Sequence, residues 1–240
     1  MSGGQVGVAT FAPVAEAQAL GAFDNRVINE RLPEAALETI QMVGFSSLFT
    51  LFLGLPLGLL LHVSSPTGLR PSFLVHRALG LVVNVGRSLP FLILLIAVIP
   101  FTRFVVGTNI GPEAAIVPLT LGAAPFFARL VENAAREVDP DTVEAAVVMG
   151  ASRMQVVTKV LVPEALPSII SGFTTTIVTI VSYSAMAGSV GGGGLGYLAV
   201  SYGYNRFQTD VMVVTVIVLV AFVQIIQLTG DFAARRLDHR

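Results

Sequence analysis

Long stretches without charged residues alternate with short charged connections along the chain. A helix needs about 20 apolar residues to cross the roughly 30 Å of hydrocarbon in a bilayer. The stretches that approach or exceed this length predict five membrane-spanning helices, at residues 39–61, 78–101, 110–130, 165–186 and 211–230. The expected fold class is therefore an all-α membrane protein with five transmembrane helices.

Residues 187–207, between the fourth and fifth predicted spans, contain four consecutive glycines and no charge before Arg206. Such a run allows close helix packing, but each glycine weakens a helix by about 1 kcal/mol relative to alanine. We therefore favour a broken, partly re-entrant segment that lines a polar path, because irregular backbone at membrane depth needs protein or water around it. The residues predicted to form this path or its gate are Ser182, Tyr183, Ser184, Met186 and Gly191, while ordinary packing is the alternative for each.

Arg87 interrupts the second predicted span. A charged side chain at membrane depth is costly and marks a functional candidate, so Arg87 joins the predicted path. The alternative is an interfacial arginine whose long side chain reaches the membrane surface.

Residues 139–167 form a polar elbow between the third and fourth spans, with two predicted short helices. Asp141 is predicted to cap the first helix with Glu144 as its capping-box partner, and Gly150 to end it in a left-handed conformation. Ser152 and Gln155 predict a capping box for the second helix. Pro163 is expected to limit that helix.

Composition agrees with a membrane protein. Of the 240 residues, 54% are hydrophobic and 12% charged, about half the charged share of soluble domains, and mean hydropathy is +0.79. Residues 1–34 are more polar and form a predicted external tail, which leaves 35–240 as the membrane domain. The net charge of −1 argues against a nucleic-acid partner, so membrane lipid is the expected environment.

The distribution of basic residues predicts the orientation, because cytoplasmic connections carry the excess of Lys and Arg. One set of connections holds nine and the other four. We therefore expect the elbow and the C-terminus inside the cell and the N-terminus outside. The nine are Arg70, Arg77, Arg129, Arg136, Arg153, Lys159, Arg235, Arg236 and Arg240, and the four are Arg26, Arg31, Arg103 and Arg206.

Nothing in the sequence predicts catalysis. A GxxxxGK[ST] phosphate loop is absent, and Ser189 in a nucleophile-like turn has no histidine or lysine base in any predicted span. The chain has no cysteine, which excludes thiolate metal sites. We expect no enzyme activity, no metal site and no cofactor.

The elbow resembles the EAA loop of ATP-binding-cassette (ABC) importer permeases. The matching residues are Glu144-Ala145-Ala146, then Gly150, then Val160-Leu-Val162-Pro163, where the usual pattern ends in Ile-x-Leu-Pro. The resemblance implies a type I ABC importer permease fold with a coupling-helix loop at residues 135–163. It also implies that Glu144, Ala145, Ala146, Gly150 and Pro163 contact a cytoplasmic ATPase, which would perform the ATP hydrolysis.

The stretches RSLPFLILLIAVIPF, PEALP and YSAMAGSVGGGGLGYLAVSYGY are similar to methionine-import permeases of this family. That resemblance implies a homodimer in the bacterial plasma (inner) membrane, two ATP-binding subunits and an external methionine-binding lipoprotein. An importer of another amino acid or small organic solute remains the alternative. An ion-coupled secondary transporter or channel would predict inverted repeats and mid-membrane ionisable residues, and apart from Arg87 the sequence offers none.

Overall fold

The computed structural model describes residues 25–237, and within that range all regular structure is helical. In chain order the elements are α2 (Arg26–Ser64), α3 (Phe73–Ser88), α4 (Phe91–Ala97), α5 (Ile99–Val106), α6 (Pro112–Arg136), α7 (Pro140–Val148), α8 (Arg153–Val156), the π-helix η1 (Val157–Leu161), α9 (Val162–Ala187), the π-helix η2 (Gly188–Gly192), α10 (Gly194–Leu198), the π-helix η3 (Ala199–Tyr204) and α11 (Thr209–Leu237). The predicted all-α fold is confirmed.

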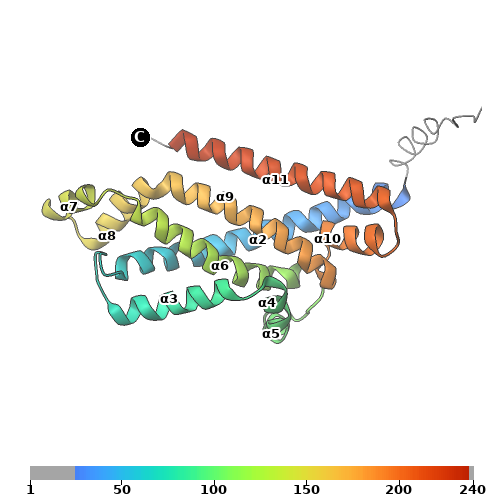
Figure 1. Cartoon of the computed structure of the whole chain (residues 1–240), viewed down its shortest axis with the longest axis horizontal. Coiled ribbons are helices and arrows are strands. Elements are labelled where there is room, and N and C mark those ends of the chain that lie inside the picture. The colour runs from blue at the N-terminus through green and yellow to red at the C-terminus, as the bar shows by residue number, and fades with distance from the viewer. Residues whose placement is uncertain (1–24, 238–240) are drawn as a thin grey trace, which may run out of the picture.

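The long helices α2, α6, α9 and α11 run along the length of the molecule, with α3 beside them (Figure 1). Helices α7 and α8 lie at one end, here called the elbow end, and α10 lies at the opposite end, here called the outer end (Figure 1). Within residues 25–237, four helical stretches are long and apolar enough to span a membrane, and the bent pair of α3 and α4 could supply a fifth.

The core lies where α2 crosses α6, and two glycines allow this close approach. A Cβ atom on Gly58 would lie 2.3 Å from the carbonyl oxygen of Ala128, and one on Gly54 would lie 2.8 Å from the Phe127 ring. Phe127 and Val131 are fully buried beside them. In a membrane the hydrophobic effect does not drive helices together, because lipid tails are as apolar as the side chains. Helices there pack mainly through small residues that let their backbones approach closely.

The second predicted span, at 78–101, is not a single straight helix. Helix α3 ends at Ser88, and the chain turns by 105° into α4. Pro90 explains the break, because a proline disfavours helical geometry at the preceding residue, and Leu89 accordingly has φ −80° and ψ 126°. Helices α4 and α5 then project sideways from the bundle (Figure 1).

The first span begins well before the predicted residue 39. Helix α2 starts at Arg26, inside the predicted tail 1–34, and residues 1–24 of that tail lie outside the described residues. Asn25 caps the helix by accepting a hydrogen bond from the Val27 N–H. Its side-chain amide donates to the Asp210 carboxylate at 2.6 Å, which connects the start of α2 to the first turn of α11.

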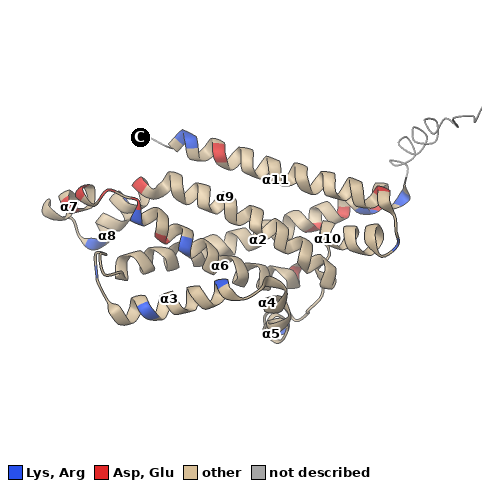
Figure 2. Ribbon diagram, viewed as in Figure 1, with Lys and Arg blue, Asp and Glu red and all other residues tan. Residues whose placement is uncertain are grey.

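The third, fourth and fifth predicted spans correspond to α6, α9 and α11. Lys and Arg side chains gather toward the elbow end, and fewer lie at the outer end (Figure 2). The end of α2, the start of α3 and the end of α11 lie with α7 and α8 at the elbow end, as five crossings require (Figure 1).

Candidate functional site

The first elbow helix, α7, is capped by Asp139 rather than by the predicted Asp141. The Asp139 carboxylate accepts a hydrogen bond from the Asp141 N–H at 2.9 Å. Pro140 follows at the first helical position, where its fixed φ suits a helix and its missing N–H is not needed. The predicted capping box of Asp141 with Glu144 therefore does not form.

The end of α7 and the start of α8 follow the sequence prediction. Gly150 has φ +87°, the left-handed conformation that glycine adopts without steric cost. The Ser152 hydroxyl accepts from the Gln155 N–H, and the Gln155 side chain accepts from the Ser152 N–H at 2.8 Å. This reciprocal pair is the predicted capping box, and it fixes where the second helix starts.

Pro163 does not end the second elbow helix, contrary to the prediction. Helical structure continues from Arg153 through α8, η1 and α9 into η2, where it breaks at Val190. The π-helical turn η1 comes just before Pro163, and the Val162 N–H bonds to the carbonyl five residues back, that of Val157. This wider turn separates the proline ring from the carbonyl it would strike in a regular α-helix. The elbow therefore joins α9 without a break.

The tip of the elbow carries exposed apolar side chains. Val148, Met149 and Met154 are 79%, 82% and 71% exposed, and Glu144 and Ala145 are also exposed on α7. Ala146 is buried, 6% exposed, on the inner side of the same helix. Of the predicted coupling residues, Glu144, Ala145, Gly150 and Pro163 are thus accessible to a partner, whereas Ala146 packs inward.

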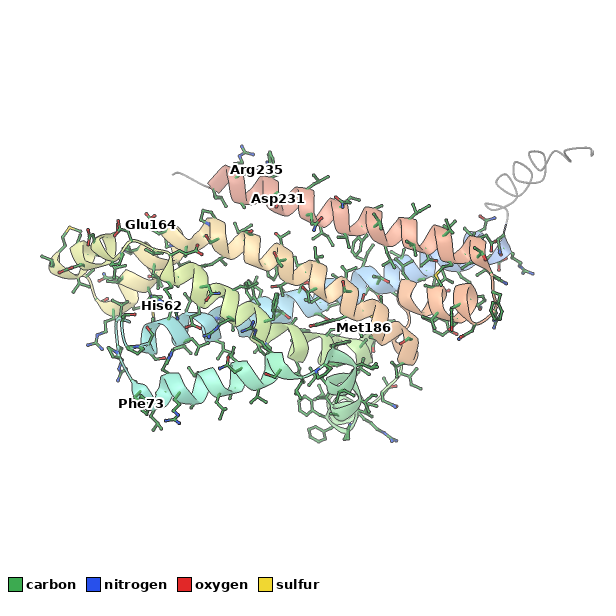
Figure 3. All side chains as sticks on the ribbon, in the orientation of Figure 1. His62, Phe73, Glu164, Met186, Asp231 and Arg235 are labelled. Atoms are coloured by element: carbon green, nitrogen blue, oxygen red, sulfur yellow. The ribbon has the colours of Figure 1, made fainter. Side chains whose placement is uncertain are left out.

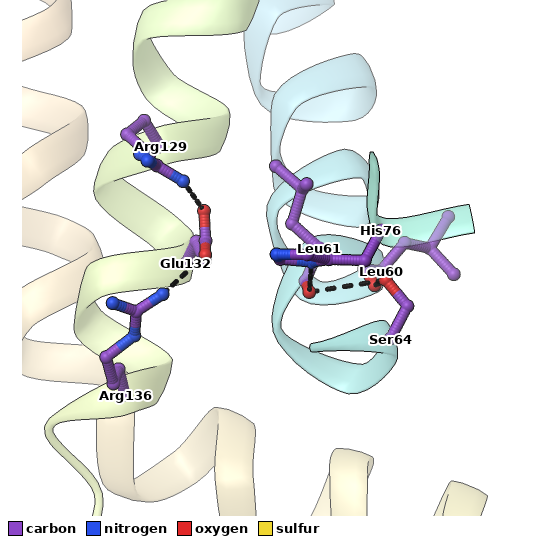
Figure 4. Close-up of polar contacts among 7 residues, drawn as sticks. All are labelled: Leu60, Leu61, Ser64, His76, Arg129, Glu132 and Arg136. Atoms are coloured by element: carbon purple, nitrogen blue, oxygen red, sulfur yellow. Dashed lines mark hydrogen bonds and ion pairs between the residues drawn. The ribbon is translucent and has the colours of Figure 1, made fainter. Parts of the chain in front are cut away.

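A buried charge cluster lies on α6 near the elbow, and the sequence analysis missed it. The Glu132 carboxylate is fully buried and binds the guanidinium groups of Arg129 and Arg136, at 2.5 and 2.7 Å (Figure 4). The spacings of three and four residues along one helix place these side chains on one face, and that spacing was the available signal. Each guanidinium donates to one oxygen of the Glu132 carboxylate. These two contacts offset the free-energy cost of burying the charge.

The glycine-rich segment breaks the backbone at the outer end of α9, as predicted. Val190 and Gly191 leave helical geometry, and Gly191, Gly193 and Gly194 have φ values of +96°, +80° and +72°. The Gly191 carbonyl accepts a hydrogen bond from the Gly111 N–H at 2.9 Å, which connects the break to the start of α6. The chain then turns back into α10 against α2 (Figure 1).

Two side chains of α2 hold the start of α10, and the sequence analysis missed this contact as well. The Glu38 carboxylate accepts from the Gly194 N–H at 2.6 Å, and the Thr39 hydroxyl accepts from the Leu195 N–H at 2.8 Å. The cap position itself is Gly193, which has no side chain to offer. Side chains from a helix 156 residues away therefore satisfy the first N–H groups of α10.

The residues predicted for the gate do not share one face of α9. Ser184 is buried and bonds back to the Val181 carbonyl. Ser182 lies beside a hollow against α11, whereas the ring of Tyr183 stacks on Phe91 of α4, with centroids 4.3 Å apart and planes 3° from parallel. Met186 is 43% exposed near the end of α9 (Figure 3).

Arg87 lies in the last turn of α3, directly before the bend into α4. It lines a cavity of about 240 Å³ together with Phe91, Phe126 and Tyr183. The structure thus brings Arg87 and Tyr183 together, and it places Ser182, Ser184 and Gly191 elsewhere.

The fold and elbow define the class: an all-helical permease with the type I importer fold. Residues 54–240 match the family described as the binding-protein-dependent transport system inner membrane component, and the chain belongs to that family. A structure titled "Inward facing conformations of the MetNI methionine ABC transporter" is similar over 90% of this chain and all of that chain, with a TM-score of 0.88 and 45% identity. An amino acid ABC transporter at 16% identity and a TM-score of 0.69 shares the fold.

Curated relatives are similar over most of their length. The probable D-methionine transport system permease protein of Vibrio cholerae is 53% identical over 212 residues, which cover 88% of this chain and 94% of the relative. That of Pasteurella multocida is 47% identical over 206 residues, covering 86% and 95%. The D-methionine transport system permease protein of Escherichia coli strain K12 is 51% identical over 151 residues, covering 63% and 70%.

Proposed function

We propose that this chain is the membrane permease of an ATP-driven methionine importer. In this proposal two copies form the path, and two cytoplasmic ATP-binding subunits dock on the elbows. An external binding lipoprotein delivers the amino acid. The names of relatives 45–53% identical to this chain support methionine as the substrate, and the similar MetNI ABC transporter supports the association with ATP-binding subunits.

The observation that carries the proposal is the continuous helical run from Arg153 to the break that begins at Val190. One end of it carries the exposed elbow, and the other reaches the glycine-rich break. ATP binding to the partner subunits displaces the elbow, and the helix transmits this movement to the glycine-rich break. The path at the break then opens and closes without any chemical step in the permease. Docking on the apolar tip at Val148, Met149 and Met154 buries surface that is otherwise open to water.

The orientation in this proposal has the elbow and C-terminus in the cytoplasm and the N-terminus outside. The gathering of Lys and Arg at the elbow end supports it. ATP-binding subunits would then have access to the elbow, and the outer end, with α10 and the start of α2, would face the delivering lipoprotein.

The test is methionine uptake in a bacterial strain without its own methionine transporter, supplied with this permease, its ATPase and its lipoprotein. Uptake should require all three components. Met149→Asp should abolish uptake by placing a charge in the docking surface, while Asp231→Arg, an exposed charge reversal on α11, should leave it intact. Uptake of a different solute in place of methionine would refute the substrate, and uptake without the ATPase would refute the whole proposal.

A further inference from the structure

The cavity beside Arg87 has the composition of a binding site for a small amino acid. Arg87 supplies a cation, Phe91, Phe126 and Tyr183 supply aromatic surface, and Leu89 and Leu94 add aliphatic surface. Its volume of about 240 Å³ falls just below the range of about 300–1,000 Å³ for drug-sized ligands. A solute with few heavy atoms suits it.

Arg87 is exposed on the surface of this single chain, but its position along α3 is far from the elbow end. It comes fourteen positions after Phe73, where α3 starts, which is about 21 Å along a helix at 1.5 Å per residue. The hydrocarbon layer is roughly 30 Å thick. Phe73 is at the elbow end of α3, and Arg77 lies one turn further along. A guanidinium this far from the elbow end faces a polar path or a partner, because exposure to lipid at this depth is costly.

Within the described residues, no carboxylate is placed to neutralise Arg87. None of the ion pairs there involves it, and α3, α4 and α5 contain no acid. The two acids of α6 are Glu113 in the first turn and Glu132, which Arg129 and Arg136 already hold.

The aromatic wall of the cavity is fixed in position. Phe91 is 6% exposed, and its ring stacks face to face on Tyr183 from α9. Gly122 of α6 leaves room for this wall, since a Cβ there would lie 3.2 Å from the Phe91 ring. The cavity is thus formed by α3, α4, α6 and α9 together, and its shape depends on how α9 lies against α4.

We propose that this cavity is a subsite for the transported amino acid, with its carboxylate on Arg87 and its apolar side chain against the stacked rings. A guanidinium binds a carboxylate through two parallel N–H···O bonds, which fixes the orientation of the solute. The subsite rests on the proposed function for the identity of the amino acid. Movement of α9 separates Tyr183 from Phe91 and releases the solute.

The test is equilibrium dialysis of radiolabelled L-methionine against the permease–ATPase complex without the external lipoprotein, which would bind the amino acid itself. Arg87→Gln should raise the dissociation constant at least about tenfold, as expected for loss of a charged hydrogen-bonded pair. Arg87→Lys should recover part of the affinity. The matched control is Arg77→Gln on the same helix, which should bind as the wild type does. In that variant only a cation lying 5.5 Å above the Phe73 ring is lost.

A second arm needs no substitution at Arg87. L-Methioninol, in which a hydroxymethyl group replaces the carboxylate, should fail to displace labelled methionine from the wild-type complex. Tyr183→Phe should bind normally because it keeps the stacked ring, and Tyr183→Ala should bind weakly. Three results would each overturn the subsite. They are displacement of labelled methionine by methioninol as strong as by methionine, normal methionine binding by Arg87→Gln, and methionine uptake by the wild-type transporter without measurable binding to the complex. Loss of methionine uptake by the wild-type transporter would instead overturn the proposed function.

Discussion

The Glu38 carboxylate of α2 accepts a hydrogen bond from the backbone N–H of Gly194, with 2.6 Å between the two atoms. Gly194 begins α10, directly after the glycine-rich break, and its φ of +72° is a left-handed conformation that other residues rarely adopt. A Cβ there would lie 2.6 Å from atoms of Met42 and Thr39. The first transmembrane helix therefore positions the segment that turns back into the bundle.

Loss of this carboxylate should loosen the outer end. Glu38→Ala leaves an N–H of α10 without its charged acceptor, and we expect a loss of about 1–2 kcal/mol in the free energy of unfolding. Glu38→Gln keeps an oxygen acceptor and should lose less. Thermal unfolding of the detergent-solubilised permease measures both. Glu34→Ala, one turn earlier and exposed with its Arg31 partner at 3.6 Å, should change the midpoint little; an equal loss there would contradict the assignment.

Replacement of Glu132 should destabilise the elbow end of α6. Without the carboxylate, the guanidinium groups of Arg129 and Arg136 lose the charge that they share. Removal of one partner from a fully buried pair costs about 3–5 kcal/mol, but Arg136 is largely exposed and water screens part of the effect. We expect about 2 kcal/mol for Glu132→Ala, measured by thermal unfolding. Glu137→Ala, at an exposed acid just beyond the helix, should cost less than half as much.

A side chain at Gly150 should impair coupling through backbone strain alone. Gly150 has φ +87°, and nothing lies within 4 Å of a Cβ built there. An L-residue in a left-handed conformation costs about 1–2 kcal/mol, so Gly150→Val should shift the elbow and reduce lipoprotein-stimulated ATP hydrolysis. Gly80→Ala on α3 is the control, because its Cβ also meets nothing and its backbone is helical. Unchanged stimulation in Gly150→Val would show that the turn geometry is irrelevant to docking.

The sequence predicted the elements that depend on neighbouring residues. Ser152 with Gln155 and the left-handed Gly150 are local patterns, and the structure contains both. The four spans that correspond to α2, α6, α9 and α11 were also found, because apolar length alone determines them. Prolines were harder to interpret: Pro90 bends the second span by 105°, while η1 accommodates Pro163 inside a continuous helix. One sequence cannot distinguish these outcomes, since they depend on what packs around each proline.

Contacts between distant residues were not predictable. Glu38 and Thr39 cap α10 from 156 residues away, and nothing near either residue identifies the partner. The stack of Phe91 on Tyr183 is also a contact between residues far apart in the sequence, and neither residue identifies the other. Glu132 differs, because its cations lie three and four residues away on the same helix. Four of the predicted path residues, Ser182, Tyr183, Ser184 and Met186, form a run along α9, and a helix distributes such a run around all its faces.

The central claim is that the elbow moves the outer gate through one continuous helix. The most direct test is the rate at which a membrane-impermeant thiol reagent labels Met186→Cys from outside, in the assembled transporter with and without ATP under conditions that prevent hydrolysis. The chain has no cysteine of its own, so the label reports a single position. Asn205→Cys, in the exposed turn after η3, is the reference position.

We expect ATP to change the labelling rate at Met186→Cys at least about threefold while Asn205→Cys stays constant. Addition of Gly150→Pro should abolish the ATP effect at Met186→Cys and leave the rate without nucleotide unchanged. An ATP effect that survives Gly150→Pro, in a protein that still inserts and assembles, would contradict the account.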